Sequence, residues 1–353
     1  MQQSVLNNNI VSLLSSDLAF AIWRNPLSTN VNVVCCNNSQ VLRTTDFNQI
    51  DQNSGFVFAP FEVTSSTPIC IFPQQSTCQP IGDFIKLDQG NNCNCATQTE
   101  YIATLKHLIG KLNNSVPKVV LSRCQWIENI DIEKTLVNFS ELLNCSHNLF
   151  VYCVRIPNIG CWIGATPETL LTISNGQAET CALAGTMPFT NGKANWSEKE
   201  INEQKIVSDF ICNTLLDNNI EFSQSPTCTT VAGKLAHLKT TFNFNAQQIN
   251  GQLGKLLQQL HPTPAVCGLP TDAARNIIAE METYNRSYYA GFVGLASNNS
   301  TQLYVNIRCM QLFANGALLY AGGGITAQSD PTNEWIETEM KMESIAHIIS
   351  KKT

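Results

Sequence analysis

The stretch that decides the fold class runs from residue 291 to residue 341 and has the sequence GFVGLASNNSTQLYVNIRCMQLFANGALLYAGGGITAQSDPTNEWIETEMK. Its β-branched and aromatic runs predict successive strands at 291–296, 302–312 and 317–321, joined by short turns rich in Asn and Gly. Asp330 can cap a helix whose first position is the proline that follows it, so a final helix is expected to begin there. Hairpin connections imply antiparallel pairing, which indicates the α+β class with mostly antiparallel sheets flanked by helices.

Upstream of this stretch, the composition of the chain changes near residue 97. Residues 1–97 are rich in Asn, Gln and Ser, and their apolar runs at 31–36 and 55–61 predict short strands and loops. From residue 98 onward, helical and strand patterns alternate. Helices are expected at 99–112, 132–143 and 197–216, and strands at 118–121, 149–156, 161–163 and 169–173. We therefore divide the sequence into an N-terminal β-rich part, 1–97, and a second region, 98–353.

The composition excludes several classes of protein. Of the 353 residues, 43% are hydrophobic and 14% are charged, which allows a sizeable core and is too few charges for a disordered chain. The net charge is −6 and no dense cluster of Lys and Arg could follow a phosphate backbone, so no nucleic-acid partner is expected. No run of about 18 apolar residues occurs, and no basic segment precedes the N-terminal apolar stretch. We therefore expect a cytoplasmic protein with no membrane contact.

The cysteine content resembles a disulfide framework only at first sight. The sequence has 15 cysteines, an odd number in a long chain, whereas disulfide scaffolds are usually short secreted chains. Cys35-Cys36 and the pair Cys93 and Cys95 lack the spacing of a zinc knuckle. We expect reduced, mostly buried thiols and no structural zinc.

The final helix carries two carboxylates and an ammonium on one face. Glu334, Glu337 and Lys341 are three and four residues apart, which places them on neighbouring turns of the same side. A solvated face linked by ion pairs is one interpretation of this pattern. The other is a functional acidic face, if a second group of carboxylates lies opposite.

The helix predicted from Ser197 carries such a second pair, Glu200 and Glu203, with Lys205 nearby. Ser197 and Glu200 also form a capping box, which could account for Glu200 by itself but not for Glu203. Two such helices facing each other would form a pocket lined only by oxygen atoms. This pocket would suit a hard cation such as Mg²⁺ rather than zinc or copper.

Two further residues have the chemistry of a base and an acid. Lys118 begins the β-branched run KVVLSR, where loss of hydration inside a sheet would favour the neutral amine. Glu168 follows GATP and precedes two leucines, so a partly buried turn could raise its pKa and make it a general acid. The plain alternatives are a strand-end lysine that reaches solvent and an ordinary turn carboxylate.

Three other features bear on a binding site. His237 lies in the alternating run KLAHLKTTF and is as easily a core residue as a functional one. Arg308, between Ile307 and Cys309, is costly to bury without an anion, structural or substrate. The run GGGITA at 322–327 fits a dinucleotide fingerprint, but the helix starts too late for one. A glycine turn at a strand end, with N–H groups directed at a carboxylate, remains possible.

Taken in order, six motifs resemble the chorismate-utilising enzymes, and isochorismate synthases most strongly. The motifs are KVVLSR at 118–123, GATPETLL at 164–171, LAGT at 183–186, LHPTPAVCGLP at 260–270, NRSYYAGFVG at 285–294, and AGGGIT at 321–326 followed by SDPTNEWIETEMK at 329–341. The resemblance covers residues from about 98 to 350, and it is loose before that. It implies one fold of two β-rich halves with the active site between them, and a chorismate-binding catalytic region at 98–353.

The resemblance also implies roles for the singled-out residues. Lys118 would activate water for attack at C2 of chorismate, and Glu168 would protonate the departing C4 hydroxyl. Mg²⁺ would be bound by Glu203 and Glu337, with support from Glu200 and Glu334. The implied substrate-binding residues are Gly185, Thr186, His237, Tyr289, Arg308, Gly322, Gly324 and Lys341. Among these, Arg308 and Tyr289 would hold the enolpyruvyl carboxylate together with N–H groups of the glycines, and Lys341 would pair with the ring carboxylate or the glutamates.

A few positions choose between branches of this family. Lys118 stands where anthranilate synthases usually have Gln, and the stretch ALAGTMP lacks the catalytic lysine of aminodeoxychorismate synthases. The sequence therefore predicts Mg²⁺-dependent conversion of chorismate to isochorismate for a menaquinone or siderophore pathway. Salicylate synthase, which adds pyruvate elimination, stays open as the alternative. Ile307 is more typical of isochorismate synthases, whereas Thr186 departs from the residue found in some isochorismate synthases. A catalytically silent relative and a metal-dependent hydrolase are further alternatives. A monomer or weak homodimer is expected.

Overall fold

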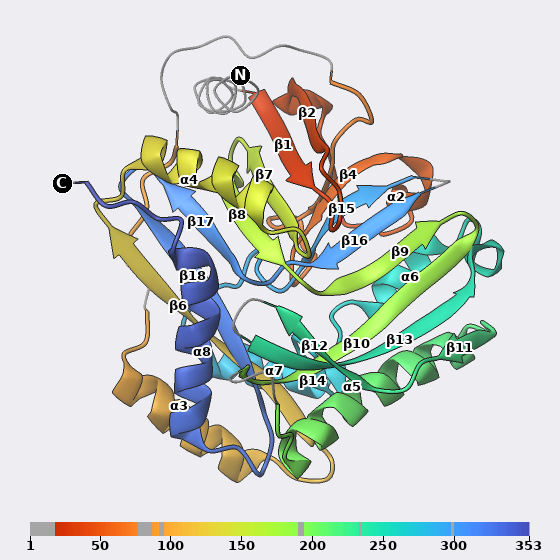
Figure 1. Ribbon diagram of the computed structural model, residues 1–353, viewed down its shortest axis with the longest axis vertical. Coiled ribbons are helices and arrows are strands. Elements are labelled where there is room, and N and C mark those ends of the chain that lie inside the picture. The colour runs from red at the N-terminus through yellow and green to blue at the C-terminus, as the bar shows by residue number, and fades with distance from the viewer. Residues whose placement is uncertain are drawn as a thin grey trace.

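The structure is a computed structural model that describes residues 18–76, 87–91, 95–189, 194–232, 235–297 and 300–352. The described strands form two sheets, and every pairing between them is antiparallel (Figure 1). The α+β class and the two mostly antiparallel sheets flanked by helices are therefore confirmed.

Sheet A has eight strands. Their order is β14 (Gly268–Leu269), β6 (Lys118–Glu128), β18 (Gly316–Ile325), β17 (Cys309–Phe313), β8 (Gly160–Thr166), β7 (Phe150–Ile156), β1 (Leu18–Arg24) and β2 (Val31–Asn37). Both faces of the sheet are covered, so alternate side chains along a strand are buried in different parts of the core. In β1, Phe20 and Ile22 pack towards α4 and the end of α8, whereas Ala19 and Ala21 pack towards sheet B.

Sheet B has ten strands. Nine of them have the order β11 (Phe222–Gln224), β13 (Leu235–Asn245), β10 (Gln177–Pro188), β9 (Thr169–Ser174), β16 (Thr301–Val305), β15 (Phe292–Ala296), β4 (Gly55–Ala59), β5 (Ile69–Ile71) and β3 (Leu42–Thr44), and β12 (Cys228–Ala232) also pairs with β13. Strands from the first 76 residues thus complete both sheets. The division of the chain near residue 97 stays a prediction.

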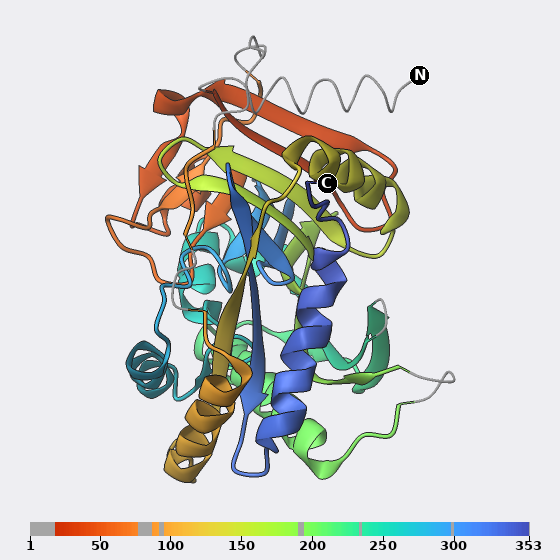
Figure 2. The same ribbon diagram turned by 90° about the vertical axis from the view of Figure 1, so that its left-hand side faces the viewer.

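The helices cover the sheets, and two of them carry the acidic motifs singled out in the sequence. They are α2 (Gln49–Gln52), α3 (Gln98–Lys111), α4 (Ile132–Cys145), α5 (Glu198–Asp217), α6 (Leu253–Leu260), α7 (Thr271–Met281) and α8 (Pro331–Ala346), with short 3₁₀ helices at Asn38–Gln40 and Ala246–Ile249. Helix α5 packs on β10, and α8 packs on β18 beside α3 (Figures 1 and 2). The predicted start of α8 is confirmed, since the Asp330 side chain accepts a hydrogen bond from the backbone N–H of Asn333 and Pro331 comes first in the helix.

One predicted strand is wrong in an informative way. The run at 302–312 is not continuous, because β16 ends at Val305 in sheet B and β17 begins at Cys309 in sheet A. Between them Arg308 adopts a left-handed conformation with φ of 50°. The buried Asn306 side chain fixes the crossing by accepting from Tyr152 Oη and donating to the backbone carbonyl of Tyr288. The hydrophobic pattern continues across this break because both strands are buried.

The glycine run is also different from the expectation of a strand-end turn. Gly322, Gly323 and Gly324 lie inside β18 and pair with β6. Glycine is required here by close approach rather than by a turn. A Cβ on Gly324 would lie 2.1 Å from Glu203 Oε1, and a Cβ on Gly323 would lie 2.7 Å from Glu334 Oε2. The glycines therefore let carboxylates of α5 and α8 reach the sheet.

Candidate active site

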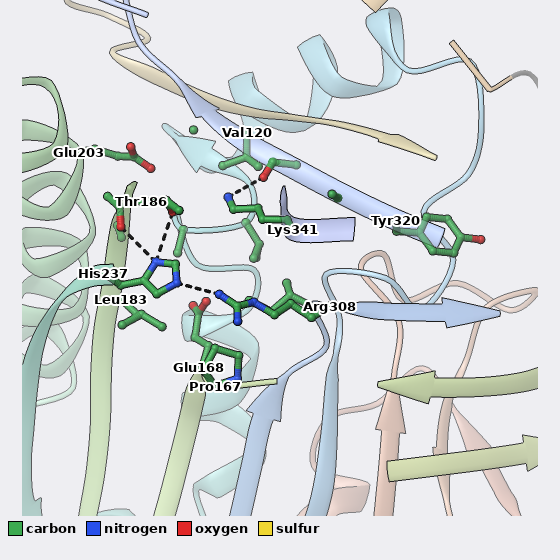
Figure 3. A pocket seen from close by; sticks show the side chains of 18 of the residues that line it. Val120, Pro167, Glu168, Leu183, Thr186, Glu203, His237, Arg308, Tyr320 and Lys341 are labelled. Atoms are coloured by element: carbon green, nitrogen blue, oxygen red, sulfur yellow. Dashed lines mark hydrogen bonds between the residues drawn. The ribbon is translucent and has the colours of Figure 1, made fainter. Parts of the chain in front are cut away.

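A cavity lies between the two sheets and is lined by most of the predicted site residues. These are Glu168, Gly185, Thr186, Glu203, His237, Tyr289, Arg308, Gly322, Gly324 and Lys341. They come from β10 and β13 of sheet B, from β18 of sheet A, from α5 and α8, and from the loops before β9, β15 and β17 (Figure 3). Lys118, Glu200 and Glu337 do not line it directly, but each lies against a residue that does. Glu334 does not line it either, and it pairs with Lys199, which also lies near the cavity residue Glu203.

Lys118, the predicted base, is fully buried at the start of β6. The alternative of a strand-end lysine that reaches solvent is therefore wrong. Its Nζ lies 3.1 Å from Glu203 Oε1, although the geometry is not that of an aligned hydrogen bond. The buried amine is thus next to one of the predicted metal-binding carboxylates, Glu203, which lines the cavity.

Glu168, the predicted acid, is 4% exposed, in the loop between β8 and β9. Its backbone N–H donates to Thr166 Oγ1 and its carbonyl accepts from the N–H of Val305, which holds the loop against sheet B. Burial raises the pKa of this carboxyl to about 7, and the positive charges of Lys118, Lys341 and Arg308 only partly oppose the shift. Glu168 can therefore carry a proton near neutral pH, as a general acid must.

His237 and Arg308 form a buried pair that lines the cavity. Arg308 Nη2 lies 2.8 Å from His237 Nε2, and His237 Nδ1 lies 3.1 Å from the carbonyl of Gly185 (Figure 3). A guanidinium can only donate and a carbonyl can only accept, so the ring carries its proton on Nδ1 and accepts at Nε2. The hydroxyl of Thr186 lies 3.2 Å from the same Nδ1.

The electrostatics of this pair agree with that tautomer. Burial, followed by the charges of Arg308 and Lys341, lowers the pKa of His237 to about 3, so the ring is neutral at ordinary pH. Burial also lowers the pKa of Arg308 to about 10, and Glu168 partly opposes that shift. The guanidinium remains charged near pH 7 and its described contacts are to a neutral ring and a carbonyl, that of Ala232 at 3.3 Å. The site thus presents a buried cation that suits an anionic ligand.

A β-bulge positions the Gly185 carbonyl. The register between β10 and β13 shifts between Ala184 and Thr186, and Gly185 has φ of 70°. A Cβ at this glycine would lie 3.1 Å from Glu200 Cβ and 3.2 Å from the Glu200 carbonyl oxygen. The close approach of α5 and the left-handed backbone therefore both require glycine at this position.

The carboxylates of α5 and α8 converge on lysines. Lys199 Nζ lies 2.7 Å from Glu334 Oε1 and 3.7 Å from Glu203 Oε2. Lys341 Nζ lies 2.7 Å from Glu337 Oε1 and donates to the carbonyl of Gly322 at 2.8 Å. The two Glu-x-x-Glu helices do face each other, as the sequence predicted.

The shifts of the two buried carboxyls differ. Burial opposes ionisation of Glu203, but the charges of Lys118, Lys199 and Lys341 outweigh it and the pKa is lowered. For Glu334, burial and then the charge of Glu337 raise the pKa to about 7, against the opposing effect of Lys199. Glu203 is therefore ionised at neutral pH, whereas Glu334 is close to half-protonated.

The donor set fits a hard divalent cation in its chemistry. Among the described residues, no three His, Cys, Asp or Glu side chains are gathered closely enough to form a metal site by themselves. Mg²⁺, however, is commonly held by one or two carboxylates together with waters and substrate oxygens. Glu334 Oε2 is buried and has no hydrogen-bond partner among the described atoms, close to the position of Gly323. An unpartnered carboxylate oxygen of this kind is a suitable metal ligand.

The structure separates residues that the sequence could not distinguish. Glu200 accepts from the backbone N–H of Ser197 at 3.0 Å, so the capping box is confirmed and any role towards a metal stays a prediction. Lys205 is not at the site, since it is 68% exposed and pairs with Asp209 along the outside of α5. Lys199 is the lysine that the sequence reasoning missed. Its position four residues before Glu203 was the available signal.

The sequence also gave no sign that three tyrosine rings gather beside the cavity. The Tyr320 and Tyr289 rings stack with centroids 5.3 Å apart, and both residues border the cavity. Tyr284 is also close to Tyr320, with ring centroids 6.0 Å apart. These residues come from two distant parts of the sequence, so no local pattern links them.

The fold and the cavity together give a site in which a buried arginine and a set of carboxylates paired with lysines lie between two antiparallel sheets. A family model described as "Chorismate binding enzyme" matches residues 79–350. The chain therefore belongs to the chorismate-binding enzyme family, and the resemblance of its motifs to this family is confirmed.

Two curated relatives illustrate the similarity. Isochorismate synthase 2 of Arabidopsis thaliana is 31% identical over 253 residues, which cover 67% of this chain and 44% of the relative. Isochorismate synthase EntC of Escherichia coli K12 is 31% identical over 245 residues, which cover 66% of this chain and 62% of the relative. The matched part of the chain thus spans about half to two thirds of these relatives.

Solved structures share the fold at lower identity. A protein described as a 2,3-dihydroxybenzoate-specific isochorismate synthase, DhbC from Bacillus anthracis, superposes with a TM-score of 0.76 at 22% identity, covering 99% of both chains. MenF, the menaquinone-specific isochorismate synthase of Escherichia coli, gives 0.73 at 20% identity and covers 96% of this chain and 90% of its own. The expected family fold is confirmed.

Two remaining expectations concern helices and thiols. In the part of the chain that the structure describes, no helix is both long and apolar enough to cross a membrane. Thirteen of the cysteines lie in that part; none is in a disulfide there and nine are buried. Cys93, named above for its spacing, lies outside the described residues.

Proposed function

We propose that this protein is an isochorismate synthase, which moves the hydroxyl of chorismate from C4 to C2. The observation that carries the proposal is that a fully buried lysine, Lys118, contacts Glu203 at the cavity, while Glu168, with a pKa raised to about 7, lines the same cavity. Lys118 and Glu168 come from separate elements, β6 and the loop before β9. Water addition at C2 needs a base and loss of the C4 hydroxyl needs an acid, on different sides of the ring. The named activities of the relatives support the same reaction.

In this mechanism, Lys118 Nζ takes a proton from the water that adds at C2. The Glu168 carboxyl donates its proton to the C4 hydroxyl, which leaves as water, so one water enters and one departs. Lys118 then returns its proton to the solvent and Glu168 takes one up, which restores both groups. The net reaction is an isomerisation, and neither group is consumed.

Substrate binding relies on local cations, because chorismate is a dianion and the protein has a net charge of −6. Arg308 is held by His237 and is the buried cation for the enolpyruvyl carboxylate. Lys341 is placed for the ring carboxylate between Glu337 and the carbonyl of Gly322. Tyr289 and Tyr320 supply an aromatic surface beside them.

Mg²⁺ is the proposed cofactor, with Glu203 and Glu337 as ligands and Glu200 and Glu334 in support. When bound there, it would neutralise the ring carboxylate beside the glutamates. The contribution of the protein is to fix the positions of those carboxylates through their ion pairs with Lys199 and Lys341.

The test is product analysis with purified protein, chorismate and Mg²⁺. We expect isochorismate by chromatography and no product after chelation of the metal by EDTA. Salicylate with stoichiometric pyruvate would assign the salicylate synthase branch, whereas binding of chorismate without turnover would assign a catalytically silent relative. Absence of both binding and turnover in folded protein would refute the proposal. We further propose a cytoplasmic monomer or weak homodimer, which light scattering at two concentrations tests for the oligomeric state.

A further inference from the structure

A pair of cysteines lies outside the proposed active site, beside a second cavity. Cys95 Sγ and Cys124 Sγ are 3.3 Å apart. Cys124 is buried in β6, and Cys95 is partly exposed in the segment that leads into α3. A disulfide has an S–S bond of about 2.05 Å, so the two sulfurs need to approach by roughly 1.3 Å.

The second cavity gives a reagent access to one of the two thiols. It has a volume of about 370 Å³ and is lined by Cys95 with Glu100, Arg123 and Tyr284, among others. Arg123 supplies a positive charge near the thiols, and it is itself held by Thr338 and Glu339 of α8. A small oxidant can therefore reach Cys95 through this cavity, whereas Cys124 is buried and does not line it.

The two thiols also differ in chemical readiness. The hydrogen bond from Cys124 lowers the pKa of Cys95 to about 7, helped by the backbone N–H of Trp126 and the charge of Arg123, although burial opposes the shift. A partly exposed thiol with this property is the attacking group in thiol–disulfide exchange, and the buried neighbour is the resolving one.

We propose that Cys95 and Cys124 form a reversible thiol–disulfide site that reacts with small disulfides such as oxidised glutathione. The Cys95 thiolate attacks one glutathione sulfur, forms a mixed disulfide and releases one glutathione. The Cys124 sulfur then attacks Cys95 Sγ and releases the second glutathione. Two protein thiols are oxidised, one glutathione disulfide is reduced, and the two thiol protons end on the two released glutathiones.

The position of the site connects it to the proposed active site. Cys124 pairs across the sheet with Tyr320 of β18, whose side chain borders the substrate cavity. Cys95 stands just before the capping box of Thr97 and Glu100 that starts α3, and α3 packs on α8. A bond between the two sulfurs would therefore tie the start of α3 to the strand that carries Lys118.

A second adjacent pair serves as an internal control. Cys153 and Cys161 lie on the paired strands β7 and β8, and burial together with their mutual hydrogen bond raises the pKa of Cys153. Both side chains are fully buried. Because this pair is sealed from solvent, it should stay reduced under conditions that oxidise the first pair.

The experiment treats the full chain with oxidised glutathione at pH 8, blocks remaining thiols with iodoacetamide and maps peptides without reduction. We expect one linked peptide joining Cys95 and Cys124, its loss after dithiothreitol, and a melting temperature raised by a few degrees through the closed loop. Cys153 and Cys161 should be fully alkylated once the chain is unfolded.

Variants assign the order of attack. With Cys124→Ser, Cys95 should keep a glutathione adduct, whereas with Cys95→Ser, Cys124 should stay unmodified. The variant Cys145→Ser, which removes an exposed thiol elsewhere, should leave the linked peptide unchanged. Alkylated Cys95 and Cys124 beside a glutathionylated Cys145, or a link from Cys95 to Cys93, would overturn the proposal. These outcomes do not depend on which reaction the active site performs.

Discussion

The two ends of the cavity are charged in opposite ways. At the carboxylate end, Glu203, Glu334 and Glu337 are each matched by Lys118, Lys199 or Lys341 within 4 Å. At the arginine end, Arg308 is held by a neutral histidine and a carbonyl, and the nearby Glu168 has a pKa near 7. Positive charge is therefore internally balanced at one end and left for a ligand at the other. In the proposed function, this difference would orient a dianion that carries its two carboxylates on different groups.

The largest expected effect comes from Lys118, the proposed general base, which contacts Glu203 at the carboxylate end. Lys118→Ala should lower kcat by roughly 10²-fold or more with little change in KM, because it removes the general base. The matched control is Lys205→Ala on the outside of α5, which should keep full activity. Steady-state kinetics of both variants test the assignment, and a Lys118→Ala enzyme with near-normal kcat would make the residue structural.

Glu168 should give the pH dependence of the arginine end. Its pKa of about 7 means that the acid form is lost as the pH rises, so kcat/KM should fall above about pH 7. Glu168→Gln should lower kcat by about 10²-fold and remove this decline, because an amide cannot titrate. Rate profiles from pH 6 to pH 9 for both proteins make the measurement. A decline that persists unchanged in Glu168→Gln would assign it to another group.

His237 tests whether the arginine end depends on a fixed tautomer. His237→Gln can place an amide oxygen near the position of Nε2 and still accept from Arg308, whereas the shorter Asn side chain reaches only the region of Nδ1. The loss of one buried charge-assisted hydrogen bond is about 1.5–3 kcal/mol, so Asn should raise KM by about tenfold or more and Gln by less. Since the pKa of His237 is lowered to about 3, no inflection near pH 6.5 should belong to it. Equal KM values for both variants would contradict the positioning role.

A smaller effect should separate the two glutamates of α5. Glu203→Gln should raise the Mg²⁺ concentration needed for half-maximal activity, because a neutral amide is a poorer ligand for a hard dication. Glu200→Gln retains the capping box, since Gln also serves at that position, and should leave the Mg²⁺ requirement unchanged if Glu200 serves only as a cap. Mg²⁺ titrations, with calorimetry as a readout independent of turnover, compare the two. A shifted requirement in Glu200→Gln would give that residue a role beyond capping.

The smallest effect concerns the product. Ile307 lines the cavity beside Arg308, and its branched side chain is stiff where the enolpyruvyl group would have to turn before elimination. The parent enzyme should release pyruvate as a minor fraction of turnover, and Ile307→Leu should raise that fraction. Coupling to lactate dehydrogenase measures it. The same fraction in both proteins would place the control of elimination elsewhere.

Features that depend on neighbours in the sequence could be predicted well. The capping box at Ser197 and the N-cap at Asp330 depend only on nearby residues. They define where α5 and α8 begin and therefore on which face of each helix its glutamates lie. The burial of Lys118 and the raised pKa of Glu168 followed from apolar flanks. Features that depend on distant segments were predicted wrongly. The spacing of Lys199 four residues before Glu203 does not show that it also reaches Glu334 of α8, and nothing in the run 302–312 marks the crossing from one sheet to the other.

By itself, the sequence determined the α+β class, the family and about half of the residues that line the cavity, because the motifs and the helical spacing are properties of the sequence itself. Only the tertiary structure decided how those residues are paired. The tautomer of His237 follows from the guanidinium of Arg308, which lies 71 residues away in the loop before β17. Glycine is required in β18 because carboxylates of α5 and α8 approach the strand closely. The physical reason is that charge, burial and close contact depend on distances between segments, and those distances exist only after the two sheets have closed on each other.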